Sequence, residues 1–251
     1  MSFFTKFILR EYIQFIKDIF IRTSFSQLGE DAVIQNHLGW LGLDFKSKGF
    51  YLDIGAHHPT FGSNTYKFYL SGSSGICIDV GTRKKRIFEL LRPRDTFINK
   101  AIVPESYSGD VMDFILASND TYGSVTGHLK EKDSPDFPTK SQIVQCETIK
   151  AKELREIAVK MPNFQQTNWR FLSMDIEGLD YEILVSLDFE FFRFDVVAIE
   201  EIVEYDPWRK TTYYIYESPI VKYLENIGYS LQSICGPTLI FVRKASRIIS
   251  C

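Results

Sequence analysis

The stretch GFYLDIGAHHPTFGSNTYKFY, residues 49–69, and the following SGICIDV, residues 74–80, decide the fold. The apolar run 50–55 ends in a glycine turn, residues 63–70 form a short capped helix, and the second apolar run is another buried strand. Strand, helix and strand in this order begin a parallel sheet covered by helices. We therefore expect an α/β chain.

The same alternation continues on both sides of this stretch. We expect helices at 82–91, 151–159, 179–187 and 211–227, strands at 96–103, 170–174 and 196–200, and a closing hairpin of 229–234 and 238–242. This order predicts a mainly parallel sheet with one antiparallel strand near its edge. Residues 106–145 lack helical periodicity, and we expect them to form an inserted β-hairpin with a mobile loop. Residues 1–48 are expected to form a helical extension before the domain 49–251.

Composition bounds the function. The 251 residues, 45% hydrophobic and 24% charged, suit one large core. A net charge of −3 without long like-charged blocks excludes a surface that tracks nucleic acid. Four cysteines lie far apart without a C-x-x-C pair, which excludes a cysteine-based zinc site or redox dithiol and suits a reducing cytoplasm.

The first twenty residues, MSFFTKFILREYIQFIKDIF, combine aromatic and aliphatic residues at near-helical spacing with interspersed charges. They are too charged to span a bilayer, and no small-residue cleavage site follows. We expect an amphipathic helix that covers a core or a homodimer seam. Peripheral contact with a membrane surface is the alternative.

Acidic residues end the expected strands. These are Asp53, Asp79, Asp175 and Glu200, with Glu201 next to the last. Ligands of open parallel sheets bind at this edge, and an acid about 25 residues after Asp53 suits the two hydroxyls of a ribose. Gly55 would allow a tight turn beside the ligand, and Asp53 would orient that turn or hold an ammonium group. The alternative is that each acid only caps a helix.

The turn after the first strand also disfavours binding of a dinucleotide cofactor. It lacks G-x-G-x-x-G, and His57, His58 and Pro59 stand where a pyrophosphate needs bare backbone. A nicotinamide-dependent reaction is therefore the weaker enzyme hypothesis.

Several motifs together carry a family resemblance. The segments that carry this resemblance are SQLGED at 26–31, the two opening strands, RPRDTFINKAI at 92–102, and FLSMDIEGLDYEIL followed by VVAIEE. From about Ser26 to Glu201 the chain resembles the FkbM methyltransferase family. The resemblance implies a seven-stranded, Rossmann-like class I methyltransferase fold and S-adenosyl-L-methionine as cofactor. It also implies methylation of a hydroxyl, on a sugar or a polyketide-type product.

The resemblance also implies site residues. The positions that match cofactor-binding segments are Asp53, Gly55, Ala56, Asn64, Asp79, Val80, Asn99, Ala101, Gln27 and Asp31. One position departs from the family, because Asp79 is followed by Val80 and Gly81 instead of proline, which alters the expected adenine pocket. Without the resemblance, Gln27 and Asp31 would belong to an amphipathic helix capped by Ser26.

The reaction requires alignment of the reactants and removal of the hydroxyl proton. We expect Asp175, Glu200 and His58 to be catalytic. Converging oxygen ligands would suit Mg²⁺ better than zinc, and the expected set is Asp175, Glu177, Glu200 and Glu201. The alternative is that Asp175 binds backbone amides of the next helix and that Glu177 is solvated.

Other polar and aromatic residues carry weaker signals. His57 and His58 more commonly bond loop backbone, while His37 and His128 show no specific pattern. An aromatic cluster follows the strand that ends at Glu200, and its members are Tyr205, Trp208, Tyr213, Tyr214 and Tyr216. These rings could stack on a sugar ring, but a contact in the core or in a dimer is favoured.

The sequence thus predicts a cytoplasmic O-methyltransferase that acts on a carbohydrate hydroxyl, on a nucleotide-linked sugar or a surface-glycan precursor. One alternative is O-methylation of a polyketide or peptide natural product, which an apolar cleft would favour. The other, from a different class, is a non-catalytic partner-binding module, which intact Asp53, Gly55 and Asp79 disfavour.

Overall fold

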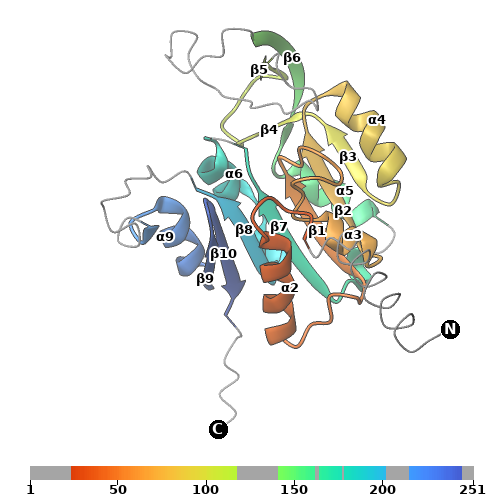
Figure 1. Cartoon of the computed structure of the whole chain (residues 1–251). Helices are drawn as coiled ribbons and strands as arrows, with labels where there is room; N and C mark the ends of the chain where they lie inside the picture. Colours follow the sequence, from red (N-terminus) through yellow and green to blue (C-terminus); the bar gives the residue numbers. More distant parts are fainter. Residues whose placement is uncertain (1–23, 118–140, 162–163, 177, 202–214, 245–251) are drawn as a thin grey trace, which may run out of the picture.

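The computed structural model describes residues 24–117, 141–161, 164–176, 178–201 and 215–244. Its centre is a seven-stranded sheet in the order β3-β2-β1-β7-β8-β10-β9 (Figure 1). The strands are β1 (Gly49–Ile54), β2 (Ser74–Asp79), β3 (Thr96–Asn99), β7 (Trp169–Met174), β8 (Val196–Glu200), β9 (Tyr229–Cys235) and β10 (Thr238–Arg243). All neighbouring pairs are parallel except those made by β10, which is antiparallel to β8 and β9. The Rossmann-like α/β prediction is confirmed.

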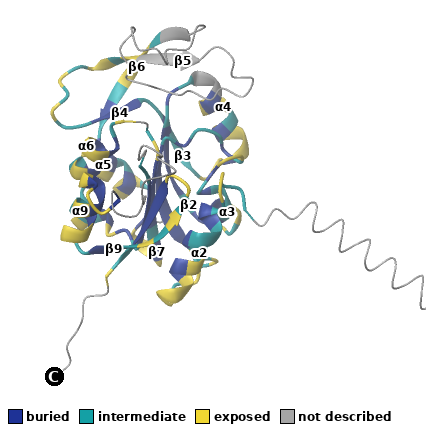
Figure 2. Ribbon diagram, turned by 60° about the vertical axis from the view of Figure 1, so that its left-hand side comes forward, coloured by how far each residue is buried: buried dark blue, intermediate teal, exposed yellow. Residues whose placement is uncertain are grey.

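Helices cover both faces of this sheet, and the buried residues form its centre (Figure 2). Alternate strand residues point to opposite faces. Leu52 and Ile54 pack with α5 (Glu153–Lys160), α6 (Asp180–Ser186), α7 (Phe189–Phe192) and α9 (Pro219–Asn226). Tyr51 and Cys77 pack on the other face with α2 (Glu30–Trp40), α3 (Tyr66–Leu70) and α4 (Thr82–Leu91).

A second, three-stranded sheet has the order β4-β6-β5. It consists of β4 (Ala101–Val103), β5 (Val111–Ala117) and β6 (Ser141–Lys150), with β5 and β6 antiparallel. Because β4 directly follows β3, this sheet lies beyond the carboxyl edge of the main sheet, at the top of Figure 1. The inserted hairpin is therefore present, and the expected loop at its centre, 118–140, lies outside the described residues.

Some element boundaries were predicted wrongly. The single strand expected at 96–103 is two strands in two sheets, separated by Lys100. The helix expected from Ser63 begins at Tyr66, because Ser63 and Thr65 take part in side-chain contacts before it. The last helix begins at Pro219, where Ser218 caps it, and residues 211–214 lie outside the described part.

The N-terminal extension is described from residue 24. Its helix α2 contributes Ile34 and Leu38 to the same core cluster as β8 and β10, so this part belongs to the domain's own core. The expected amphipathic helix of residues 1–20 lies outside the described residues. In the described part of the chain, no helix combines the length and apolarity that crossing a bilayer requires.

Candidate active site

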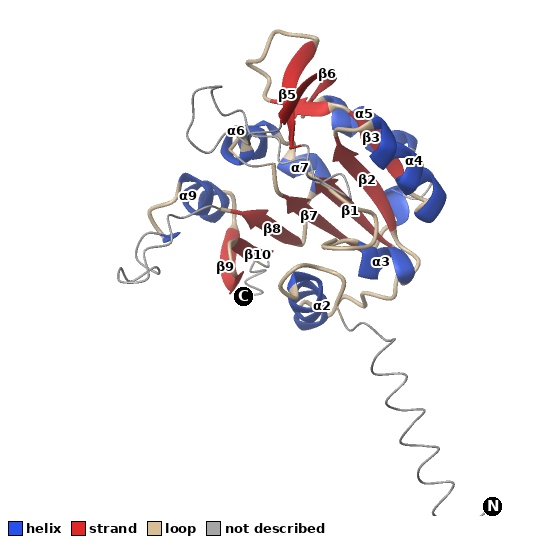
Figure 3. Ribbon diagram, turned by 45° about the horizontal axis from the view of Figure 1, so that its top comes forward, coloured by secondary structure: helices blue, strands red, loops and turns tan. Residues whose placement is uncertain are grey.

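Four acidic side chains end neighbouring strands at the carboxyl edge of the main sheet. Asp53, Asp79 and Glu200 each stand two residues after Tyr51, Cys77 and Ala198, which pack on the α2–α3–α4 face. Their side chains therefore leave the sheet toward this same face. Figure 3 shows these strand ends side by side. The acids lie where ligands of open α/β sheets bind.

The turn after β1 depends on Gly55. The N–H groups of Gly55 and Ala56 both donate to the Ile78 carbonyl, at 3.0 Å each, which ties the turn to β2. Gly55 has φ +81°, and a Cβ atom there would lie 1.7 Å from the Asp175 carbonyl oxygen. The expected tight turn is present, and the backbone at the end of β7 makes glycine necessary.

Asp53 is buried beneath this turn. It is 4% exposed, and its Oδ2 accepts a 2.5 Å hydrogen bond from the Thr65 hydroxyl. Burial raises the pKa of Asp53 to about 6, against the opposing effects of the Arg92 guanidinium and the Thr65 bond. Asp53 thus orients the turn through Thr65, which is one of the two roles expected for it.

Arg92 holds the loop that carries Thr65. This guanidinium is 1% exposed and donates to the Pro59 carbonyl, Ser63 Oγ and Thr65 Oγ1. On its other side it pairs with Asp95 at 2.6 Å, and Asp95 also accepts from the Tyr51 hydroxyl and the Cys77 thiol. We call these residues the Arg92 network: Arg92, Asp95, Tyr51, Cys77, Ser63 and Thr65.

Sequence reasoning missed Arg92 and Asp95 as individual positions. Both belong to RPRD, which carried part of the family resemblance, but the pattern does not show that they turn inward. In the same loop, Asn64 donates from Nδ2 to Ser173 Oγ on β7, at 3.2 Å. Asn64 therefore connects the loop to the strand that ends beside Asp175.

Asp79 is fully engaged by the protein itself. The N–H groups of Val80 and His57 donate to its Oδ1 and Oδ2, at 2.5 Å and 2.6 Å. The Lys84 ammonium lies 2.9 Å from both oxygens. The acid expected to bind ribose is therefore held in position by backbone and covered by a lysine that the sequence did not single out.

The segment after β2 departs from the family pattern at Val80 and Gly81. Gly81 has φ +136° and donates its N–H to Asn99 Oδ1 at 2.6 Å, so Asn99 anchors this segment to the end of β3. Ala101, in β4, is buried and pairs with Thr148 of β6. Asn99 and Ala101 therefore join the candidate adenosine end to the inserted sheet.

Asp175 and Glu200 form a carboxyl pair at the ends of β7 and β8. Burial by the surrounding protein, then a hydrogen bond and repulsion from Glu200, raise the pKa of Asp175 to about 8, and the positive charge of His57 opposes this. Part of Asp175 stays open to solvent. Asp175 can therefore hold a proton near neutral pH and remain accessible to a ligand.

Residues 53–231 match the sequence model described as the methyltransferase FkbM domain, over well more than half of the chain. The chain belongs to the FkbM methyltransferase family. Curated proteins provide no match to the chain. The matched region begins at Asp53, the first acid of the site, and runs into β9, so all four acidic strand ends lie within the FkbM domain.

Of the four expected metal ligands of this FkbM methyltransferase, Asp175 and Glu200 lie together as the carboxyl pair, while Glu201 is bound elsewhere. Glu201 Oε2 accepts a 2.5 Å bond from Ser218, the cap of α9, and Glu177 lies outside the described residues. Among the described residues, no group of three or more His, Cys, Asp or Glu side chains could hold a metal ion. The structure therefore gives no support to the expected Mg²⁺ site.

Asp180 organises the loop after Asp175. Its carboxylate accepts from the N–H groups of Ile176 and Gly178, at 3.1 Å and 3.2 Å. Burial raises the pKa of Asp180 to about 6 although these two bonds oppose the rise. Asp180, the first residue of α6, thus binds backbone amides of the loop that precedes the helix, and no side chain caps α6.

His58 makes the loop contacts considered as its alternative role. Its Nδ1 accepts from the N–H groups of Thr60 and Phe61, at 3.2 Å and 3.1 Å. A neutral ring with Nδ1 as acceptor carries its hydrogen on Nε2, where it donates instead of accepting a proton. The geometry favours Asp175 over His58 as a base, and a catalytic role for His58 stays a prediction.

The N-terminal extension of the FkbM domain meets the same edge of the sheet. Phe25 accepts from Ser63 N at 3.0 Å, and Glu30 Oε1 contacts Thr238 Oγ1 at 3.5 Å, where Thr238 pairs with Glu200. Asp31 is fully buried and accepts from Phe25 N and Ser26 Oγ. This carboxylate thus stabilises the extension, and Gln27 is exposed.

Ser26, considered as the cap of α2 only in the alternative without the resemblance, does not hold that position. Gly29, with φ +93°, is the cap residue, and Ser26 Oγ instead accepts from Asp31 N inside the first turn. Four residues of the aromatic cluster, Tyr205, Trp208, Tyr213 and Tyr214, lie outside the described residues, as does His128. Tyr216 is described and is 55% exposed.

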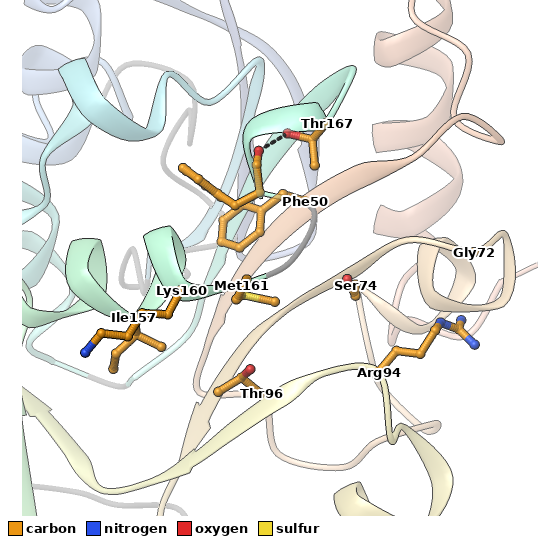
Figure 4. Close-up of a pocket in the computed structure, with 10 residues that line it drawn as sticks. Phe50, Gly72, Ser74, Arg94, Thr96, Ile157, Lys160, Met161 and Thr167 are labelled. Carbon is orange, nitrogen blue, oxygen red and sulfur yellow. Dashed lines mark hydrogen bonds between the residues drawn. The ribbon is translucent and has the colours of Figure 1, made fainter.

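A cavity of about 470 Å³ lies at the opposite, amino edge of the sheet (Figure 4). Phe50, Ser74 and Thr96, at the starts of β1, β2 and β3, line it together with Met161 and Phe164. Arg94 at its rim donates to the Tyr69 carbonyl and stacks on the Tyr69 ring. This cavity is thus separated from the acidic edge by the length of the strands.

Proposed function

We propose that this FkbM methyltransferase uses S-adenosylmethionine to methylate a hydroxyl group of a carbohydrate. The observation that supports this most is the placement of two acid groups with different surroundings at one edge of the sheet. Asp79 is held by backbone N–H groups, whereas Asp175 shares a proton-binding site with Glu200. The first suits binding of a neutral diol, and the second suits proton removal.

The residues present fit the cofactor. Asp79 is oriented by two backbone donors, and its oxygens accept the ribose hydroxyls in this proposal once the Lys84 ammonium leaves them. The αL turn at Gly55 brings bare backbone beside it, and Asp53 lies beneath that turn. S-adenosylmethionine, when bound, would supply a methyl group on a positively charged sulfur, and an edge rich in carboxylates suits that charge.

Asp175 supplies the proton chemistry in this proposal. A sugar hydroxyl must lose its proton as its oxygen attacks, and ionised Asp175 accepts that proton while Glu200 remains beside it. A pKa of about 8 lets the pair exist in both states near neutral pH. The hydrogen bond from Asn64 to Ser173, at 3.2 Å, holds the loop after β1 against the strand that ends beside Asp175.

The carbohydrate is favoured over a polyketide because the described edge of the site is polar. Asp79, Asp175 and Glu200 all face it, and sugar hydroxyls are donors that carboxylates accept. A polyketide acceptor would gain affinity from an apolar lining. A cytoplasmic location and a nucleotide-linked or surface-glycan acceptor remain part of the proposal.

Calorimetric titration tests the cofactor. We expect S-adenosylmethionine to bind and NADH not to bind, and Asp79→Ala to weaken S-adenosylmethionine at least tenfold because the ribose loses a charged acceptor. Glu225→Ala, which changes an exposed acid on α9, is the matched control and should bind as the unmodified protein does.

Two results would contradict the proposal. Equal affinity of Asp79→Ala and the control would remove Asp79 from the cofactor site. Absence of S-adenosylmethionine binding to a folded, unmodified protein would favour the partner-binding module over an enzyme.

A further inference from the structure

Lys84 is a buried cation at the start of α4. Lys84 is only 6% exposed, and its ammonium lies 2.9 Å from both carboxylate oxygens of Asp79. Lysine is almost never buried this deeply unless an opposite charge pairs with it. The pair is therefore a specific feature of the site's architecture.

Asp79 has no remaining acceptor capacity in this state. A carboxylate offers about four lone-pair positions. Val80 N and His57 N occupy one position on each oxygen, and Lys84 bridges the other two. A ribose that binds Asp79 through its hydroxyls would therefore need the oxygens that Lys84 holds.

We propose that Lys84 is an internal competitor for the cofactor's ribose, which occupies Asp79 until S-adenosylmethionine displaces it. This inference rests on the proposed function and names a residue that sets the affinity of the same site. Its consequence is that the protein binds its cofactor more weakly than the geometry of Asp79 alone would allow.

The local structure makes the displacement possible but costly. The ammonium sits at the end of a flexible four-carbon chain, so it can leave without moving the helix. The first turn of α4 holds no acidic residue. A released Lys84 ammonium would lie near the positive end of the helix without a carboxylate from that turn, which is electrostatically unfavourable. Cofactor binding has to offset this cost.

The neighbouring turn shows that the Lys84 charge faces the site. Burial, and then the Lys84 ammonium, lower the pKa of His58, three residues after Gly55. Lys85, the next residue, differs sharply, because it is exposed and lies 3.9 Å from the equally exposed Glu89. Lys85 thus provides a matched control on the same helix with the same charge.

The test compares Lys84→Met and Lys84→Gln with Lys85→Met and the unmodified protein. Calorimetry with S-adenosylmethionine and with S-adenosylhomocysteine should show about tenfold tighter binding for both Lys84 variants, within the range usual for coupled sites. Thermal unfolding should show a lower melting temperature without ligand and a larger ligand-induced rise, because Asp79 lacks its cation until the ribose arrives. Lys85→Met should change neither quantity.

Lys84→Gln retains a neutral donor for Asp79, so it gives a result even where Lys84→Met impairs folding. Unchanged or weaker affinity in Lys84→Gln, while the unmodified protein binds, would overturn the competitor role and leave the proposed function intact. Failure of every protein, including the folded unmodified one, to bind either ligand would overturn the proposed function and this inference with it.

Discussion

At Gly55 the backbone conformation and the surrounding space both require glycine. The residue has φ +81°, and the Asp175 carbonyl occupies the position of a Cβ atom. Gly62 shares only the first condition, with φ +62° and no atom within 4 Å of the point where a Cβ atom would lie. The two glycines therefore separate backbone strain from steric exclusion.

We expect Gly55→Ala to lower the free energy of unfolding by about 3 kcal/mol or more, because strain and collision add. Gly62→Ala should cost only about 1 kcal/mol, from the positive φ alone. Urea denaturation of both variants measures the difference. Equal losses would show that β7 yields easily to the new methyl group.

Asp175 connects activity and stability to pH. Its pKa of about 8 in the folded protein lies above the ordinary value of 3.8. In the proposed reaction the ionised form is the base, so turnover should rise with pH through about 8. The folded state prefers the protonated form, so the stabilising contribution is complete below pH 3.8 and is lost as pH rises through about 8.

Asp175→Asn should therefore lower turnover by at least a hundredfold without weakening S-adenosylmethionine binding. Its melting temperature should increasingly exceed that of the unmodified protein between about pH 5 and pH 9, because the amide avoids the repulsion from Glu200. Parallel assays and melting curves across this range measure both effects. Full activity of the variant would take Asp175 out of the chemistry.

Residue identities were predictable from sequence where strand ends define them. Asp53, Asp79, Asp175 and Glu200 follow from apolar runs that stop at an acid. Lys84 was not predictable, because a lysine in the run TRKKR looks like part of a solvated helix face. Only the three-dimensional path after Gly81 turns Lys84 toward Asp79.

Among the elements, the loop between β1 and α3 depends on contacts that its own sequence does not reveal. Arg92, just after α4, donates to Pro59, Ser63 and Thr65, and none of these contacts follows from helical or strand periodicity. The loop in turn carries Asn64 and orients Asp53. A helix end thus positions the candidate cofactor turn.

Arg92→Met should lower the free energy of unfolding by about 3–5 kcal/mol, because Asp95 would remain buried without its cation. Arg86→Met, at an exposed position of α4, should change it by less than about 0.5 kcal/mol. Denaturant unfolding monitored by circular dichroism measures both. A loss in Arg92→Met no larger than in the control would mean that the network contributes little to folding.

Element boundaries failed where the chain changes sheets. Residues 96–103 read as one apolar strand, but Lys100 separates β3 in the main sheet from β4 in the inserted sheet. Periodicity reports which residues are buried and carries no information about which partner strand buries them. The same limit applies to the start of α3, which the contacts of Ser63 and Thr65 delay.

For the whole molecule, the order of strands and helices was sufficient to predict the layers. Alternating βα units imply a parallel sheet with helices on both faces, and the final hairpin brings in β10 as the antiparallel strand. The contact of residues 24–31 with β10 was not predictable, because it joins segments some 200 residues apart.

In the proposed scheme, the carboxyl edge of the main sheet carries the reaction and the amino edge does not. All four acids lie at the carboxyl edge beneath the inserted sheet, while the cavity of about 470 Å³ opens at the amino edge. Because the strands between them are packed on both faces, ligands at the acidic edge cannot reach that cavity. Changes at the amino edge are thus free to tune stability without touching the acids.

The buried thiol of Cys77 is an internal probe of local unfolding. Cys77 lies in the central sheet, is fully buried and donates to Asp95, and burial raises its pKa well above that of an ordinary thiol. Only a thiolate in contact with water reacts with an alkylating reagent. In a variant whose other three cysteines are replaced by serine, the rate of Cys77 alkylation would therefore measure how often β1, β2 and the Arg92 network separate.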